Sequence, residues 1–246
     1  MKERPLIEQL GSRQQSAYKQ YQEVFVGKET FGAFLKYELI TFFLGPMPGA
    51  LGYAMRKIGY QWLLERVGKG SVFGTGVVIR SPGRISIGNR VMIDDYVVLD
   101  AKGNTSMIKM GDEILVGRNT IISCNEAIIR VGNFVSIGPF CFFASKGLIE
   151  IGSNVSIGSG THLLAGSHSF DDPDLPIIQQ ARTAKGIIVE ENVWIGTGSK
   201  ILDGVTVGRN SIVGAGAVVS KDVPAWTVVL GNPARVVEKR KKESTA

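Results

Sequence analysis

Residues 189–224 read VEENVW-IGTGSK-ILDGVT-VGRNSI-VGAGAV-VSKDVP, and each group of six begins with an aliphatic residue. Neither the 3.6-residue period of a helix nor the alternation of a simple strand gives this spacing over six consecutive groups. A period of six is typical of parallel β-helices, in which each group forms one short strand and a corner. Three groups then make one triangular coil.

The same period extends back through most of the chain. Glycine follows many of the first positions, where we expect it to adopt corner backbone angles that other residues resist. The pattern predicts a mainly β fold, a parallel β-helix of about seven coils, over residues 67–237. The first positions fall in seven triplets: Val67, Phe73, Ile79; Ile87, Ile93, Leu99; Met110, Val116, Ile122; Val131, Ile137, Phe143; Ile151, Ile157, Leu163; Val189, Ile195, Ile201; Val207, Val213, Val219.

Insertions interrupt this period at several points. Residues 81–85 and 101–109 are expected to form short corner loops. A longer insertion begins at Gly166-Ser167-His168, and the period resumes only at Val189. Because long insertions in repeat proteins tend to carry the function, the loop at residues 168–188 is the first candidate for a site.

An N-terminal segment, residues 1–66, precedes the repeat. Its first thirty residues are polar, with apolar residues at roughly helical spacing from Leu6, Ile7 and Leu10 onward, which predicts one or two helices. Residues 31–65 predict two apolar helices on either side of the break at Gly45–Gly49. They are too short to span a membrane.

Two interpretations of residues 31–65 stay open. The helical pair covers the end of the β-helix or joins a neighbouring subunit, or it attaches peripherally to the inner surface of a membrane. Aromatic residues that alternate with basic ones suit the second interpretation.

Charge and cysteine content suggest the cellular setting. The net charge of +6 includes a basic run in the tail at residues 238–246, but no aromatic residues accompany that run, so nucleic-acid binding is not expected. Cys141 occupies an inward position of the repeat, and Cys124 also lies within the repeat. No apolar run follows Met1–Arg4. We expect a cytoplasmic protein, in a reducing compartment and with the option of peripheral contact with the inner membrane.

Three motifs near the C-terminus carry a family resemblance. NVWIG at 192–196, AGAVVSKDVP at 215–224 and GNPARVV at 231–237 resemble the hexapeptide-repeat acyltransferases, in particular maltose and galactoside O-acetyltransferases. The resemblance extends from Ile151 to Val237. LGPMPGALG at 44–52 resembles bacterial members that are associated with surface polysaccharide assembly.

The resemblance implies a left-handed β-helix, a homotrimer with sites between subunits, and acetyl transfer from acetyl-CoA to a hydroxyl group of a sugar or polysaccharide precursor. Two alternatives stay open: activity like that of serine O-acetyltransferases or another acyl-CoA transferase, and a non-catalytic hexapeptide-repeat scaffold.

His168 is the candidate catalytic base, since it lies where the family places its catalytic histidine. An imidazole can accept a hydroxyl proton near neutral pH. No serine or cysteine lies in a nucleophile setting, which favours direct transfer. His162 is interpreted as structural. Zinc catalysis needs three protein ligands, and the only two histidines lie on different faces, so no metal is expected.

Acceptor contacts are expected from Ser145 and Lys146, and from Asp171 and Asp172, one of which could orient the imidazole. The chain departs from the sugar enzymes here, with Gly138 and Lys146 where those carry Asn and Asp.

The resemblance also implies the coenzyme A contacts. Thr197 and Ala215 would offer backbone groups to the pantetheine arm, and Trp194 would pack on the thioester end. Ser220 and Lys221 would reach the nucleotide, and Arg235 a phosphate.

Overall fold

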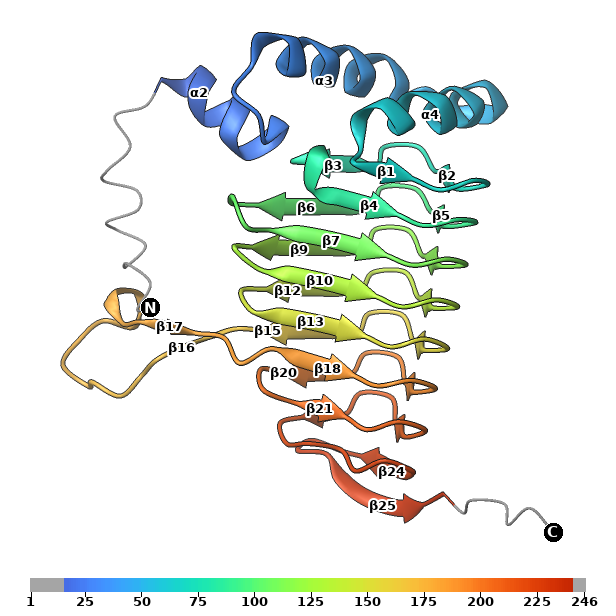
Figure 1. The fold of residues 1–246 in the computed structure, drawn as a ribbon. Coiled ribbons are helices and arrows are strands. Elements are labelled where there is room, and N and C mark those ends of the chain that lie inside the picture. The colour runs from blue at the N-terminus through green and yellow to red at the C-terminus, as the bar shows by residue number, and fades with distance from the viewer. Residues whose placement is uncertain (1–15, 241–246) are drawn as a thin grey trace.

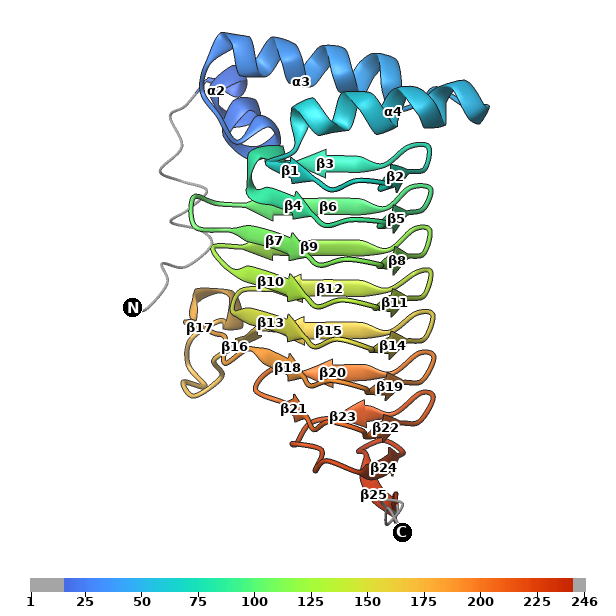
Figure 2. The same ribbon diagram turned by 45° about the vertical axis from the view of Figure 1, so that its right-hand side comes forward.

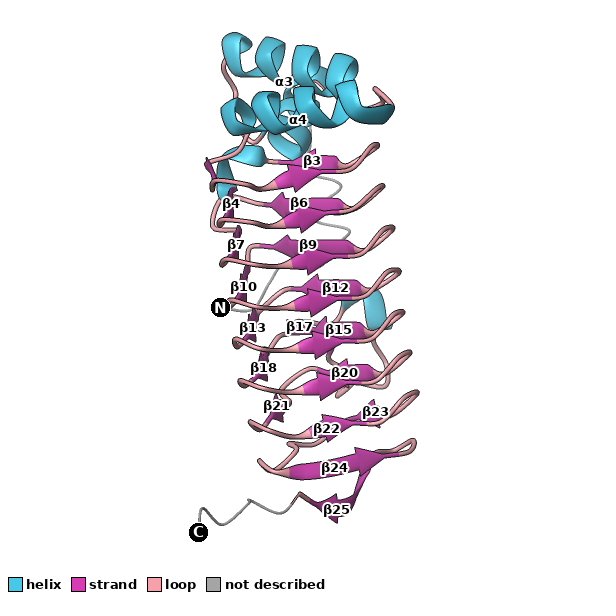
Figure 3. Cartoon of the chain, turned by 90° about the vertical axis from the view of Figure 1, so that its right-hand side faces the viewer, coloured by secondary structure: helices cyan, strands magenta, loops and turns pink. Residues whose placement is uncertain are grey.

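The chain winds as a triangular prism in a computed structural model that describes residues 16–240. The apolar positions at Leu6, Ile7 and Leu10 lie outside these residues. Each coil contributes one short strand to each of three faces, and strands of neighbouring coils pair in parallel. In Figure 1 the near strands run to the right and the far strands return to the left as the chain descends, which is a left-handed path. Figure 3 shows the same stacked coils from the side, with the strands of face A edge-on at the left.

The three faces have the following strands. Face A contains β1 (Arg66–Val67), β4 (Ile85–Ile87), β7 (Met107–Met110), β10 (Ile128–Val131), β13 (Leu148–Ile151), β18 (Ile187–Val189) and β21 (Thr206–Val207). Face B contains β2 (Val72–Phe73), β5 (Met92–Ile93), β8 (Leu115–Val116), β11 (Ser136–Ile137), β14 (Ser156–Ile157), β19 (Trp194–Ile195), β22 (Ile212–Val213), β24 (Thr227–Leu230) and the antiparallel β25 (Arg235–Lys239). Face C contains β3 (Val78–Arg80), β6 (Val98–Lys102), β9 (Ile121–Asn125), β12 (Phe142–Ser145), β15 (His162–Ala165), β20 (Lys200–Leu202) and β23 (Val218–Val219).

The first positions of the six-residue groups form the core. On each face they pair with one another from coil to coil, as Phe73 with Ile93 and Ile93 with Val116 do on face B. All of these side chains are buried except Val67, which is partly buried. The prediction of a parallel β-helix of about seven coils is confirmed.

The glycines after these positions have a different role from the one expected. Gly117, for example, does not have a left-handed backbone, but a Cβ there would lie 2.5 Å from the backbone nitrogen of Pro139 in the next coil. Glycine is required at this position because the coils approach closely. The left-handed angles occur two residues later, as at Asn119 (φ 58°).

A helical cap, residues 17–63, covers the first coil (Figure 2). It contains α2 (Ala17–Tyr21), the π-helix η1 (Gln22–Val26), α3 (Phe31–Leu44) and α4 (Gly49–Leu63), with the expected break after Gly45. Arg56 is buried and donates to the carbonyl oxygens of Leu44, Met47 and Phe73. The cap is therefore tied to the prism, and the interpretation that the helices cover its end is confirmed. No helix within residues 16–240 is long and apolar enough to cross a membrane.

The insertions in the repeat collect at the corner between face C and face A, which we call the loop corner. The 3₁₀ turn η2 (Pro82–Arg84) and residues 103–106 lie there, as does the long loop. That loop begins and ends as an antiparallel hairpin, β16 (Ser167–His168) with β17 (Arg182–Thr183), and contains the 3₁₀ turn η3 (Ile177–Gln179). The hairpin projects away from the prism (Figure 1).

Candidate active site

His168 lies at the base of the projecting hairpin. It lies three residues after the end of β15 and pairs with Arg182 across the two-stranded ribbon. Its Nδ1 atom is buried and has no hydrogen-bond partner within residues 16–240. Because buried polar atoms normally have a partner, this nitrogen points to a group that residues 16–240 do not supply.

A hollow of about 440 Å³ opens beside this histidine. Successive coils contribute to its walls at the loop corner, so residues far apart in sequence lie together. It is lined by Lys102, Ser123, Asn125, Ala144, Ser145, Lys146, Leu164, Ala165, Gly166, Ser167, His168 and Arg182. The structure thus brings together three of the predicted site residues, His168, Ser145 and Lys146.

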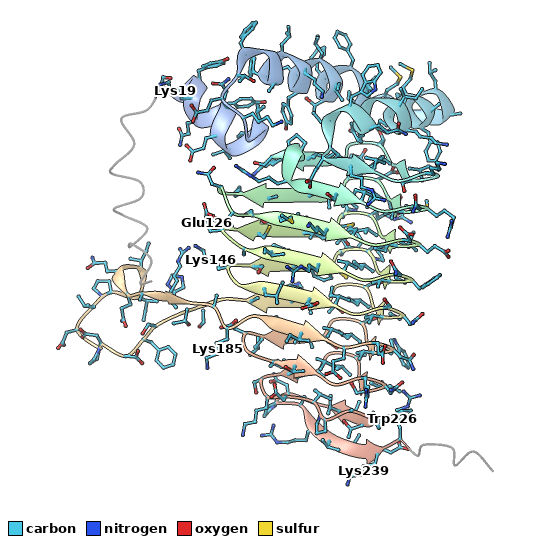
Figure 4. All side chains as sticks on the ribbon, viewed as in Figure 1. Lys19, Glu126, Lys146, Lys185, Trp226 and Lys239 are labelled. Carbon is cyan, nitrogen blue, oxygen red and sulfur yellow. The ribbon has the colours of Figure 1, made fainter. Side chains whose placement is uncertain are left out.

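Ser145 and Lys146 are placed one coil before the histidine. Ser145 pairs with Ala165 at the end of β15, and its hydroxyl donates to the carbonyl of Gly147. The backbone N–H of Lys146 donates to the carbonyl of Ala165 at 2.8 Å. In Figure 4 the Lys146 side chain extends from the prism on the side of the hairpin. These backbone contacts therefore place both residues next to the hollow.

Asp171 and Asp172 do not line the hollow. Asp171 accepts a hydrogen bond from Ser169 Oγ at 2.6 Å, and Asp172 accepts one from the backbone of Asp174 at 2.9 Å. No hydrogen bond joins either carboxylate to His168 within the described residues. In this conformation both side chains shape the loop.

Sequence reasoning missed several residues of the hollow. Lys102 and Asn125 are register partners at the ends of β6 and β9, so extending the period by a few residues would have placed them at the same corner. Arg182 gave no such signal, because only the hairpin pairing brings it to His168. His162 is absent from the walls; its ring packs edge-on against Phe142 on face C, at 5.8 Å.

The predicted pantetheine contacts lie at another edge, the corner between face B and face C. The Gly216 N–H donates to the carbonyl of Thr197 at 2.8 Å, and a Cβ on Gly196 would meet the nitrogen of Ala215 at 2.5 Å. Thr197 and Ala215 are therefore stacked on neighbouring coils, and both are exposed.

Bare backbone runs beside these two residues. Gly160, Gly198 and Gly216 are left-handed, and a Cβ built on any of them would have nothing within 4 Å. We call these three positions the glycine strip. The equivalent left-handed position is Gly76 in the first coil, but the next three coils carry side chains there, at Tyr96, Asn119 and Phe140. A long thin ligand could approach the backbone along the last coils without meeting a side chain.

The remaining predicted cofactor residues are exposed and scattered. Trp194 is 55% exposed on face B, and Ser220 and Lys221 follow β23 at the loop corner. Arg235 begins β25, and its Nη1 donates to the carbonyl of Ala234 at 2.8 Å. Ser220 and Lys221 share the loop corner with His168, two coils further along the prism, and face C separates this corner from the glycine strip.

Both cysteines are buried and unpaired. Burial raises the pKa of Cys124 to about 11 and also raises that of Cys141. Neither thiol is a nucleophile near neutral pH. No cluster of three or more histidine, cysteine or acidic residues that could hold a metal occurs in the described part of the chain.

Residues 186–221 match the family described as bacterial transferase hexapeptide (six repeats). The chain is 38% identical to a protein of Schizosaccharomyces pombe named as an acetyltransferase, over 42% of this chain and 49% of that protein. It is 38% identical to the galactoside O-acetyltransferase of Lactococcus lactis, over 47% of this chain and 45% of that enzyme. It thus spans about half the length of these curated relatives.

Among solved structures, the chain is similar to a variant of AntD from Bacillus cereus, with a TM-score of 0.53 and 25% identity. The match covers 77% of this chain and 89% of that one. AntD is described as an N-acyltransferase, in complex with dTDP-4-amino-4,6-dideoxyglucose and coenzyme A.

Proposed function

We propose that the protein transfers an acetyl group from acetyl-CoA to a hydroxyl group of a sugar or of a surface-polysaccharide precursor. The observation that supports this most is the hollow beside His168. It combines an imidazole with serine, asparagine and lysine side chains that suit a polyhydroxylated ligand. The named acetyltransferases among the relatives support the choice of acyl group.

His168 acts as the general base in this proposal. The imidazole accepts the proton of the acceptor hydroxyl as its oxygen bonds to the acyl carbon, and then passes the proton to the departing sulfur. Backbone N–H groups stabilise the negative charge that develops on the carbonyl oxygen. The buried, high-pKa cysteines leave no thiol for an acyl-enzyme, which supports direct transfer.

In this proposal coenzyme A binds along the glycine strip. Thr197 and Ala215 expose backbone there, and the strip has no side chains to block a pantetheine arm. Trp194 would contact the thioester end, and Arg235 a phosphate. Ser220 and Lys221, the residues proposed for the nucleotide, lie at the loop corner, and face C separates them from the strip of the same chain. When bound, acetyl-CoA supplies the activated acyl group as a thioester.

The working unit in this proposal is a trimer with sites between subunits. His168 and the glycine strip lie at opposite edges of face C, so one chain cannot present both to the same thioester. The hairpin also exposes Phe170 (77%), Leu175, Ile177 and Ile178, which would be costly to leave in water. Packing the hairpin against a neighbouring prism would bury these residues, and a ring of three closes such a head-to-tail contact.

Thiol release from acetyl-CoA in the presence of candidate sugars tests the function. His168→Ala should lower turnover by about 10²–10⁴-fold, the usual contribution of a general base. His162→Ala is the matched control and should cost far less. Two equally harmless substitutions would contradict the assignment of the base. Thiol release with free serine, or with an amino sugar in place of a hydroxyl acceptor, would indicate a different class of acceptor.

A second property is proposed for the helical cap: attachment to an anionic membrane surface. Each long helix carries an outward apolar stripe at helical spacing besides the face that packs on the prism. The stripes are more than one-third exposed and consist of Phe31, Leu35, Leu39, Phe42 and Phe43 on α3, and Leu51, Met55, Ile58 and Trp62 on α4. This arrangement suits two helices lying in a lipid interface.

The charges of the two helices favour anionic lipid. Residues 31–63 contain four charged side chains. Arg56 is buried, and Glu38 is turned inward to accept from Tyr21 at 2.6 Å. The exposed charges are those of Lys36 and Lys57, both basic. A basic, aromatic-rich apolar surface complements a bilayer that contains anionic headgroups.

Flotation with phosphatidylcholine–phosphatidylserine vesicles tests this attachment. The protein should float with them, and Phe42→Gln combined with Phe43→Gln should abolish flotation. Phe134→Asn with Phe140→Asn is the control, because these phenylalanines are similarly exposed at prism corners. If the cap instead joined two copies of the chain, the mass by light scattering would double without vesicles, and the membrane proposal would fail.

A further inference from the structure

Three basic side chains share the hollow with His168. Lys102 comes from the end of β6, Lys146 follows β12, and Arg182 lies on the returning strand of the hairpin. No aspartate or glutamate is among the described residues that line it. The other walls are neutral, from short polar groups such as Ser123 and Asn125. The hollow is therefore electropositive.

Asp100 lies beside Lys102 and offsets part of the charge at that end of the hollow. Asp100 Oδ2 lies 2.9 Å from the Lys102 ammonium nitrogen, but it also lies 3.5 Å from Arg80 Nη1. Asp100 is buried and shared between two cations, so this cluster keeps one net positive charge. This ion-pair cluster does not include Arg182 on the hairpin.

Arg182 has no acidic partner within the described residues: no carboxylate lies within 4.0 Å of its guanidinium, although the residue is partly buried. Withdrawing a guanidinium from water without a counterion costs free energy. Its planar fork matches the two oxygens of a carboxylate or phosphate. An anionic group in the hollow would provide the missing counterion.

We propose that the acceptor is an anionic sugar, carrying a carboxylate or a phosphate that Arg182 binds with help from Lys102 and Lys146. This inference rests on the proposed acetyl transfer and specifies its substrate class. The hollow volume falls within the usual range of about 300–1,000 Å³ for small-molecule sites, which suits a sugar unit with its charged substituent. Arg182 is then the specificity-determining residue, because it lies beside His168 in the ribbon.

The nucleotide end of coenzyme A is a less suitable source of this charge. The hydroxyl that His168 deprotonates belongs to the acceptor, so the space beside this imidazole is where the acceptor must lie. The bare backbone that suits coenzyme A is at the other edge of face C. The cations of the hollow therefore face the acceptor.

Binding is tested without turnover by calorimetric titration with glucose, glucuronate and glucose 1-phosphate. At least one of the two anionic sugars should bind, and comparing glucuronate with glucose 1-phosphate shows whether the site binds a carboxylate or a phosphate. Glucose should bind at least about tenfold more weakly. Arg182→Gln should remove this difference, and Arg182→Lys should restore part of it. Arg130→Gln is the control, because Arg130 is exposed on face A. Equal binding by wild type and Arg182→Gln would overturn the proposal.

Turnover separates this inference from the proposed function. With acetyl-CoA present, the anionic sugar that binds should release thiol faster than glucose, and Arg182→Gln should raise its KM more than it lowers kcat. If no sugar released thiol but anion binding still required Arg182, acetyl transfer would fail and the anion site would stand. If glucose were the better acceptor and Arg182→Gln had no effect, the anion site would fail and acetyl transfer would stand.

Discussion

At the scale of single residues, two buried tyrosines hold the helical cap by different means. Tyr37 donates its hydroxyl hydrogen to the carbonyl of Ile79 at 2.9 Å. Tyr60 is fully buried and packs edge-on against Phe73, at 5.0 Å, but its hydroxyl has no partner within the described residues. The first hydroxyl contributes to stability, whereas the second is a buried polar group without compensation.

Replacing each tyrosine by phenylalanine should separate these effects. Tyr37→Phe should lower the free energy of unfolding by about 1 kcal/mol, because it leaves a buried carbonyl unpaired. Tyr60→Phe should be neutral or stabilising, because the ring stays and only an unpaired hydroxyl is lost. Chemical denaturation measures both values. A larger loss for Tyr60→Phe would indicate that a bound water or a neighbouring subunit pairs with its hydroxyl.

The same pair predicts how stability depends on alkaline pH. Burial is the main cause that raises the pKa of Tyr60 to about 12, and likewise that of Tyr37. In the unfolded chain these hydroxyls ionise near pH 10. Between about pH 10 and 12 the unfolded state therefore binds fewer protons, and stability falls as pH rises. Tyr60→Phe should show a shallower fall of Tm over this range, and identical slopes would contradict the shift.

At the scale of elements, the six-residue period predicted the strands well but the corners only in part. Side chains at the first positions point into the core in every coil, so a local pattern specifies strand, face and register together. The role of Gly117 depends instead on how closely the next coil approaches, which no local pattern reveals. Arg182 reaches the hollow only through the hairpin pairing with His168, so it could not be predicted from the repeat.

The glycine strip gives a prediction at this scale. Gly198→Phe should place a ring over the strip and raise the KM for acetyl-CoA at least about tenfold, because the site would lose bare backbone. Phenylalanine is tolerated in this geometry, since Phe140 has a φ of 60° at the equivalent position. Phe140→Gly is the control and should leave the KM unchanged. Steady-state kinetics with varied acetyl-CoA measure both, and an unaltered KM for Gly198→Phe would place the coenzyme elsewhere.

At the scale of the whole molecule, the two halves of the proposed site lie at different corners of the prism. A trimer would place the loop corner of one chain opposite the glycine strip of the next. Size exclusion with light scattering should therefore report about three times the 26.6 kDa chain mass. A fully active monomer would contradict both the trimer and the shared site.

Mixed trimers provide a sharper test of sharing. His168→Ala and Gly198→Phe chains should each be nearly inactive at limiting acetyl-CoA. When the two are unfolded together and refolded, some interfaces will combine an intact histidine with an intact strip, and activity should return. Mixing the two proteins without unfolding is the control. Failure to recover activity in trimers shown to be mixed would place both halves of the site on one chain.

The regular stacking of the coils fixes the distance between the helical cap and the site at His168. Four strand-to-strand steps on face C separate β3, beneath the helical cap, from β15, which leads into His168. At about 4.8 Å a step, plus a helical layer about 10 Å thick, the reacting hydroxyl would be held about 30 Å from a bilayer on the outer side of the cap. Acceptors anchored in that bilayer would be selected by length as well as by chemistry. Removing one coil would shorten this reach by about 4.8 Å and leave both ends of the molecule unchanged.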